Sequence, residues 1–218
     1  MSKKIDMKSI SSFYQNRKRL PMGKHSYFSV LVPFVEVEGE LCLLFQQRAT
    51  GDIMSSGEIC FPGGHMEAGE SAGRCALRET EEEMGIPSDR IRFVGRGDTM
   101  KGFSGYTLYT TIGEIKHEDY LNMNIEKSEV AEGFLVKVSE FLDKPPYVYK
   151  SNVIADRSDF PYELAGISED YPWSMGTWDT VIYNVEDIEG KHRIVWGITG
   201  GIVRHVMDQI EELIDSYR

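Results

Sequence analysis

Runs of β-branched and aromatic residues recur along the chain at lengths typical of strands. Residues 26–37 (SYFSVLVPFVEV) and 41–48 (LCLLFQQR) are two such runs, and the EGE segment between them predicts a β-hairpin. Shorter runs of the same kind predict further strands or strand ends at 91–97, 106–115, 133–138, 180–185 and 192–198.

Other segments space their apolar residues three and four positions apart, which predicts helices. Ser71 can cap a helix that ends before Gly85, because glycine suits the left-handed position after a helix. Short helices are predicted near 10–19 and at 138–142. Since strands and helices interleave without regular alternation, we expect an α+β fold in which helices flank a mixed sheet.

The end of the chain predicts a longer helix with one apolar stripe. The stripe consists of Ile202, Val203, Val206, Met207, Ile210, Leu213 and Ile214. Core packing is the simpler interpretation of this stripe, and a contact between two copies in a homodimer is the alternative.

Length and composition favour one domain. The chain has 218 residues, of which 41% are apolar, and this suffices for one well-filled core. We expect a single domain over 26–218, with an irregular insertion around 144–178 and the predicted helix at its C-terminus. Residues 1–25 form a basic segment, since 1–24 hold seven lysines and arginines and one acid. This segment is expected to be solvated, and contact with a phosphate-bearing ligand is the alternative.

The net charge and the lack of targeting signals limit the classes of partner and the compartment that we expect for this protein. A net charge of −11 argues against nucleic acid as a partner. No apolar run approaches the ~20 residues that span a bilayer, and the N-terminus lacks the apolar middle of a signal peptide, so we expect a cytoplasmic protein with no membrane partner. Cys42, Cys60 and Cys75 are odd in number and form no C-x-x-C pair, which predicts reduced thiols and neither disulfides nor a zinc site.

The segment RETEEEMG (78–85) carries four glutamates within five positions. On a helix, Glu79, Glu82 and Glu83 are three and four residues apart, so their carboxylates share one face, whereas Glu81 points elsewhere. Such a run is ordinarily a solvated surface, where like charges cost roughly 0.2–0.5 kcal/mol per pair. The alternative is a divalent cation that neutralises the three carboxylates, and oxygen ligands of this kind suit Mg²⁺ or Mn²⁺.

The spacing around the glutamates favours the metal site. Eight residues match the Nudix hydrolase signature, G-x5-E-x7-R-E-U-x-E-E-x-G-U with U apolar: Gly64, Glu70, Arg78, Glu79, Glu82, Glu83, Gly85 and Ile86. Thr80 departs from it at the first apolar position. The chain therefore resembles the Nudix hydrolases, and the resemblance implies their α/β/α sandwich, with a mixed sheet between helices.

The resemblance also implies a reaction and its catalytic residues. Members of the family cleave diphosphate linkages with Mg²⁺ or Mn²⁺, and the matching positions make Glu79, Glu82 and Glu83 the metal ligands. Arg78 would orient a neighbouring carboxylate. All four residues are thus candidate catalytic residues.

Many members recruit a further glutamate from a later loop as a base or extra ligand. Glu129, just before a predicted strand, is the first candidate for a catalytic role here, ahead of Glu132 and Glu126. Glu70 is expected to be structural and His65 to be a loop residue.

The segment before the signature, LLFQQRATGDIMSSGEICFPGG, is similar to an element of the coenzyme A diphosphatases in this family, L-L-T-x-R-S-x3-R-x3-G-x3-F-P-G-G. The similarity implies that Arg48, Gly63 and Gly64 bind substrate, with glycine amides free to approach an anion. Ile53 stands where a second arginine is expected. Later, HRIVWGITGGIVRHV resembles the Trp-Gly-x-Thr segment of the same subgroup.

We therefore expect a small nucleotide-type substrate, with coenzyme A (CoA) or an acyl-CoA favoured. The products would be 4′-phosphopantetheine and 3′,5′-ADP. The alternative substrates are ADP-ribose, a nucleotide sugar or another nucleoside diphosphate derivative. A third interpretation is a nucleotide-binding sensor without catalysis.

Overall fold

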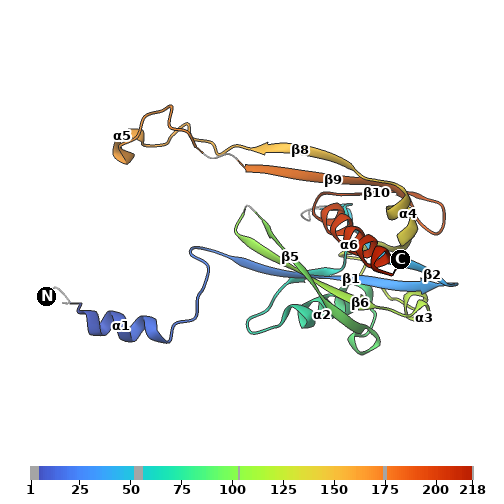
Figure 1. Ribbon diagram of the computed structural model, residues 1–218. Helices are drawn as coiled ribbons and strands as arrows, with labels where there is room; N and C mark the ends of the chain where they lie inside the picture. Colours follow the sequence, from blue (N-terminus) through green and yellow to red (C-terminus); the bar gives the residue numbers. More distant parts are fainter. Residues whose placement is uncertain (1–4, 52–55, 103, 174–175, 218) are drawn as a thin grey trace.

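The computed structural model describes residues 5–51, 56–102, 104–173 and 176–217 (Figure 1). Lys3 and Lys4 of the basic segment, and Ile53, lie outside these ranges. The helices are α1 (Met7–Gln15), α2 (Ala72–Met84), η1 (Ser88–Arg90, a 3-10 turn), α3 (His117–Leu121), α4 (Val138–Asp143), α5 (Tyr162–Ala165) and α6 (Gly197–Ser216). The strands are β1 (Ser26–Val37), β2 (Glu40–Arg48), β3 (Ile59–Cys60), β4 (Gly63–His65), β5 (Arg92–Gly102), β6 (Tyr106–Glu114), β7 (Val130–Lys137), β8 (Tyr147–Val153), β9 (Gly176–Glu186) and β10 (His192–Trp196).

The predicted hairpin is confirmed by the antiparallel pairing of β1 and β2. Val37 pairs with Glu40, so the turn consists of Glu38 and Gly39. Both turn residues have a positive φ, 52° and 83°. Such two-residue turns match the right-handed twist of the strands, which is why the chain reverses here.

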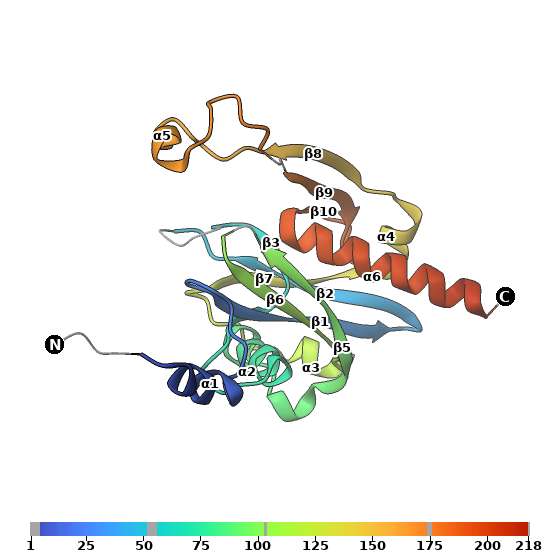
Figure 2. The same ribbon diagram turned by 60° about the vertical axis from the view of Figure 1, so that its left-hand side comes forward.

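Seven strands form the main sheet, in the order β3-β2-β1-β6-β5, with β4 also paired to β1 and β7 to β2. The β1–β6 pair is parallel and the other pairs are antiparallel, so the sheet is mixed, as predicted. In Figure 2, α2 and α3 cover one face and α6 the other. The expected α/β/α arrangement is therefore confirmed.

Each face of the sheet has its own core because successive side chains on β1 point in opposite directions. Leu31 packs with Ala76 and Met84 on the α2 side, whereas Val32 packs with Val203 on the α6 side. The first half of the α6 stripe is thus buried within this chain. Towards the C-terminus the stripe is exposed at two positions, Leu213 (52%) and Ile214 (40%).

A second sheet, β10-β9-β8, covers the other side of α6 (Figure 2). Val181, Tyr183 and Val195 pack in the same core as α6. The insertion around 144–178 therefore contributes β8 and the start of β9. Between these strands the chain runs out to α5, which projects away from the main sheet in both views.

The N-terminal helix, predicted near 10–19, is α1 and lies slightly earlier. Asp6 caps it by accepting a hydrogen bond from the Ser9 N–H at 2.9 Å. None of its residues is buried, and Figure 1 shows it apart from the rest of the chain.

The three cysteines are free thiols, as predicted. Cys42 and Cys75 are buried, and burial raises the pKa of both thiols. Across the described ranges, no helix is both long enough and apolar enough to cross a membrane.

Candidate active site

The signature segment folds into a strand, a loop and a helix. β4 carries the glycine pair, and Ser71 at the end of the loop caps α2 by accepting a hydrogen bond from the Arg74 N–H at 3.4 Å. Gly85 ends the helix with a φ of 65°, and a Cβ there would overlap the Asn124 carbonyl group. Position 85 therefore requires glycine for both conformation and space.

Thr80, the one departure from the signature, packs as an apolar residue would. Its side chain is fully buried, and its hydroxyl donates to the Ala76 carbonyl oxygen at 2.7 Å. Because the helix itself satisfies the hydroxyl, the departure leaves no unpaired polar group in the core.

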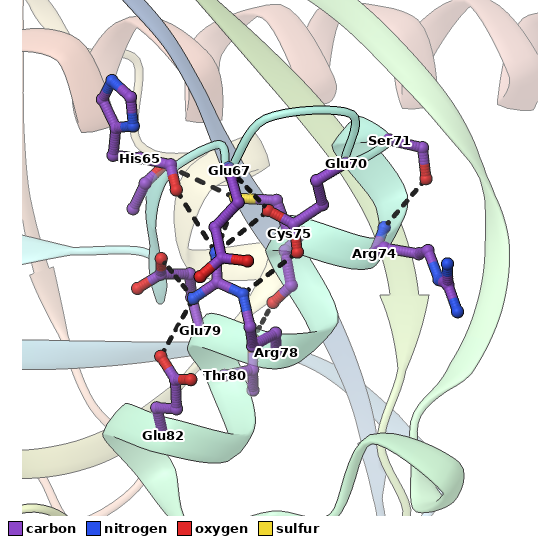
Figure 3. Close-up of polar contacts among 12 residues, drawn as sticks. His65, Glu67, Glu70, Ser71, Arg74, Cys75, Arg78, Glu79, Thr80 and Glu82 are labelled. Carbon is purple, nitrogen blue, oxygen red and sulfur yellow. Dashed lines mark hydrogen bonds and ion pairs between the residues drawn. The ribbon is translucent and has the colours of Figure 1, made fainter.

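Arg78 is the centre of the polar cluster in Figure 3. Its Nε and Nη2 donate to the two carboxylate oxygens of Glu70 at 3.0 and 3.1 Å. Its Nη1 donates to Glu79 at 2.8 Å and to Glu82 at 3.0 Å, and Nη2 also donates to the His65 carbonyl oxygen at 3.2 Å. Arg78 therefore ties the loop to two of the predicted metal ligands.

Glu70 and His65 lie at this junction in structural positions. The hydrogen bonds from Arg78 lower the pKa of Glu70 to about 2, so this carboxylate stays ionised and paired. His65 contributes its backbone carbonyl, while its ring points away from the cluster in Figure 3 and meets Phe28 edge-on.

Glu83 differs from the other glutamates of the run because it is buried. It is 4% exposed, and its Oε2 accepts a hydrogen bond from the Gly63 N–H at 2.9 Å. Burial raises the pKa of Glu83 to about 7, although Gly63, Gln46 and Arg48 act in the opposite direction. The expectation that the Gly63 amide is open to an anion is therefore wrong, since the amide is bonded to Glu83.

Gly64 lies directly against the Glu79 carboxylate. A Cβ added at position 64 would overlap that carboxylate, so a larger residue would displace it. Burial raises the pKa of Glu79, with smaller effects of the same sign from Glu82 and Glu129, whereas Arg78 lowers it. Glu79 is thus close enough to Glu82, Glu83 and Glu129 for its charge to interact with the charge of each.

The donor set of α2 fits a hard divalent cation. Glu79, Glu82 and Glu83 supply carboxylate oxygens from one stretch of helix, and burial disfavours the negative charge of two of them. No three His, Cys, Asp or Glu side chains in the described parts of the chain are arranged to hold a metal ion as they stand. Instead, Glu79 and Glu82 accept hydrogen bonds from Arg78, and Glu83 accepts one from the Gly63 N–H. Metal binding by these residues stays a prediction.

Glu129 lies in the loop before β7 and is exposed. The Glu129 carbonyl oxygen accepts a hydrogen bond from the Ala49 N–H at 2.8 Å, which fixes the loop next to the end of β2. Its carboxylate is close enough to Glu79 to raise the pKa of that residue. This position is compatible with the predicted role as a base.

The two weaker candidates for that role have other partners. Glu132 accepts a hydrogen bond from Arg193 at 2.6 Å, and Arg193, 7% exposed, is also bonded to Asp187 at 2.8 Å. Glu126 accepts a hydrogen bond from the Ser128 hydroxyl at 2.8 Å. The structure therefore favours Glu129 over both.

A cavity of about 520 Å³ adjoins the glycine pair and collects the predicted substrate-binding residues. Arg48, Gly63 and Gly64 all line it, together with Ile198 and Thr199 at the start of α6. Apolar side chains of β1 and β6 line much of the remainder. A larger cavity of about 640 Å³ lies between the start of α2 and β5–β6, and it includes none of the predicted site residues.

Sequence reasoning did not find Gln46 and Thr199. Gln46 is fully buried, donates to Cys60 Sγ at 3.7 Å and stabilises the charged form of Glu83. Its signal in the sequence is a polar residue directly after an apolar run, LCLLFQ. Thr199 belongs to the Trp-Gly-x-Thr segment, but its place in the cavity depends on how α6 packs.

The buried Glu83 predicts a pH-dependent stability of the metal-free protein. The folded pKa of about 7 lies above the ordinary value of 4.5, so the wild type loses stability as the pH rises from about 4.5 to 7. This loss amounts to roughly 3 kcal/mol at most. Glu83→Gln removes the charge and keeps an acceptor for Gly63, so we expect it to raise the melting temperature at pH 8 and to change it little at pH 5. Calorimetry in EDTA tests this, and equal melting temperatures at pH 8 would contradict it.

In the comparison with protein families, the NUDIX domain matches residues 25–155. This range contains the main sheet, α2 and the loop before β7, so it includes every predicted catalytic residue.

Three similar proteins illustrate the relationship. Nudix hydrolase 3 of Caenorhabditis elegans is 31% identical over 144 residues, which cover 61% of this chain and 60% of that protein. The peroxisomal coenzyme A diphosphatase NUDT7 of Mus musculus is 30% identical over 134 residues, 61% of this chain and 56% of that protein. The uncharacterized Nudix hydrolase NudL of Enterobacter sp. (strain 638) is 26% identical over 183 residues, 84% of this chain and 81% of that protein. The matched regions thus span less than two thirds of the first two relatives. Since the NUDIX domain matches more than half of the chain, the chain belongs to the Nudix hydrolase family.

Proposed function

We propose that this Nudix hydrolase cleaves the diphosphate linkage of CoA or an acyl-CoA, giving 4′-phosphopantetheine (or its acyl form) and 3′,5′-ADP. The observation that carries the proposal is that Arg48 and the glycine pair line one cavity next to the glutamates of α2. The similarity of residues 44–64 to the CoA diphosphatase element supports the substrate. So does the mouse relative, which is named a coenzyme A diphosphatase.

The reaction is a hydrolysis at phosphorus. The oxygen of a water molecule bonds to one phosphorus, the bond to the bridging oxygen breaks, and that oxygen leaves with the other phosphate. Glu129 accepts the proton of the attacking water. Two phosphomonoesters result, and no redox partner is needed.

Each residue of the site has a role in this proposal. Glu79, Glu82 and Glu83 would hold Mg²⁺ or Mn²⁺, which neutralises charge on the phosphates and lowers the pKa of a water. Arg78 keeps Glu79 and Glu82 in position, as its hydrogen bonds to both indicate. Arg48 attracts the negative substrate into the cavity. The glycine pair leaves room for the diphosphate next to the carboxylates.

A substrate panel tests the proposal. With Mg²⁺ or Mn²⁺, we expect CoA to be hydrolysed with a kcat/KM at least about tenfold above that of ADP-ribose and a nucleotide sugar, about 1.4 kcal/mol in transition-state binding. Chromatography should resolve two phosphomonoesters, and EDTA should abolish their formation. Activity confined to ADP-ribose or nucleotide sugars would overturn the CoA assignment, and binding without any turnover would indicate a sensor.

A further inference from the structure

Thr199 is a largely buried residue with a hydroxyl that is free to bond a further group. The residue is 8% exposed, and no hydrogen bond joins its hydroxyl to any residue of the described ranges. It lines the 520 Å³ cavity at the start of α6. Its hydroxyl is not among the fully buried unpaired polar atoms of the described residues, so it is open to the cavity, where a bound group can accept its hydrogen bond.

The start of α6 adds a second feature that selects anions. α6 has 20 residues, no side chain caps its N-terminus, and its first turn contains no acidic residue. The N-terminus of a helix carries a partial positive charge and backbone N–H groups directed outward. In this chain that end of the helix faces the cavity through Ile198 and Thr199.

Arg48 supplies a full positive charge in the same cavity. Its side chain contacts the Cys60 thiol and its charge acts on Glu83, but within the described residues it forms no ion pair. Glu58 is the one carboxylate among the described lining residues, and it is not paired with Arg48. The guanidinium is therefore available to a negatively charged ligand.

We infer that Thr199, the first turn of α6 and Arg48 form a phosphate subsite for a phosphomonoester of the substrate that is not cleaved. The inference rests on the proposed function, in which this group is the 3′-phosphate of CoA. The proposal assigns the cleaved diphosphate to the α2 carboxylates, which contact the glycine pair through the Gly63 N–H and the Cα of Gly64. ADP-ribose and common nucleotide sugars carry no such phosphomonoester, so the subsite would determine the choice among substrates.

Kinetics with CoA and 3′-dephospho-CoA test the subsite, since both contain the same diphosphate. We expect the wild type to prefer CoA by about tenfold to hundredfold in kcat/KM, the range of one hydrogen bond to a charged group. Thr199→Val, which replaces the hydroxyl with a methyl group, should bring this ratio close to one, and Thr199→Ser should retain it. Thr180→Val on β9, outside the cavity, is the matched control and should keep the wild-type ratio.

A binding measurement in EDTA tests the phosphate subsite independently of hydrolysis, because the metal ions needed for the reaction are removed. Titration calorimetry should show 3′,5′-ADP binding about tenfold more tightly than 5′-AMP, and Thr199→Val should remove the difference. If CoA is cleaved but Thr199→Val changes neither the kinetic ratio nor the binding difference, the subsite is wrong and the proposed function stands. If the binding difference depends on Thr199 but CoA is not cleaved, the subsite stands and the proposed function is wrong.

Discussion

Glu83→Gln is expected to lower kcat for CoA hydrolysis by about 10³-fold at saturating Mg²⁺. The amide has the shape of the carboxylate and can still accept the hydrogen bond from the Gly63 N–H, so the fold should be retained. It lacks the negative charge that a divalent cation requires of a ligand, and the loss corresponds to about 4 kcal/mol of transition-state stabilisation. Steady-state kinetics with chromatographic detection of the products measures the effect.

Glu81→Gln is the matched control for this experiment. Glu81 lies in the same run, but its carboxylate is turned away from the site and accepts a hydrogen bond from the Ser88 N–H at 2.9 Å, which lowers its pKa. Glutamine can accept the same bond, so we expect activity within about twofold of wild type. A loss below tenfold in Glu83→Gln, or equal losses in the two variants, would contradict the proposed roles.

Gly64→Ala is expected to lower kcat/KM by about 10²-fold. The added Cβ would overlap the Glu79 carboxylate, which must then leave the position in which Arg78 holds it. Mutating a residue that supports a metal ligand, as Gly64 supports Glu79, typically costs ten- to hundredfold in metal affinity or activity. Kinetics over a range of Mn²⁺ concentrations should show a higher metal requirement as well as a lower rate.

Gly95→Ala on β5 is the corresponding control. No atom lies within 4 Å of a Cβ added at position 95, so we expect wild-type kinetics. Melting temperatures of both variants separate a local change at Glu79 from a general loss of stability. Wild-type metal dependence in Gly64→Ala would contradict the close contact between the loop and Glu79.

Features that depend on neighbouring residues could be predicted from the sequence. The β1–β2 hairpin follows from two strand-forming runs around a two-residue turn, and α2 follows from its cap, its periodicity and Gly85. The shared face of Glu79 and Glu82 is a consequence of helical spacing alone, and Arg78 does bridge them. The Nudix signature then supplied the interpretation of this face as a diphosphatase site.

Features that depend on distant residues could not be predicted in this way. The second sheet pairs β8 with β9 across the excursion that carries α5, and no local pattern records that pairing. Arg193 is bonded to Glu132 and Asp187, and this pairing makes Glu132 a weaker candidate for the base than Glu129. Neither partner could be assigned from spacing, because they lie on separate elements.

The sequence by itself determined the family, the helix that carries the glutamates, and the residues expected to bind metal and substrate. These depend on short-range spacing, which the backbone geometry of a helix or strand converts directly into a shared face. Only the tertiary structure decided that Glu83 is buried against Gly63, and that Thr199 faces the cavity with Arg48. Burial and unpaired polar groups arise from the packing of segments that are far apart in the chain, so the side-chain environment of each residue is fixed only when the fold is complete.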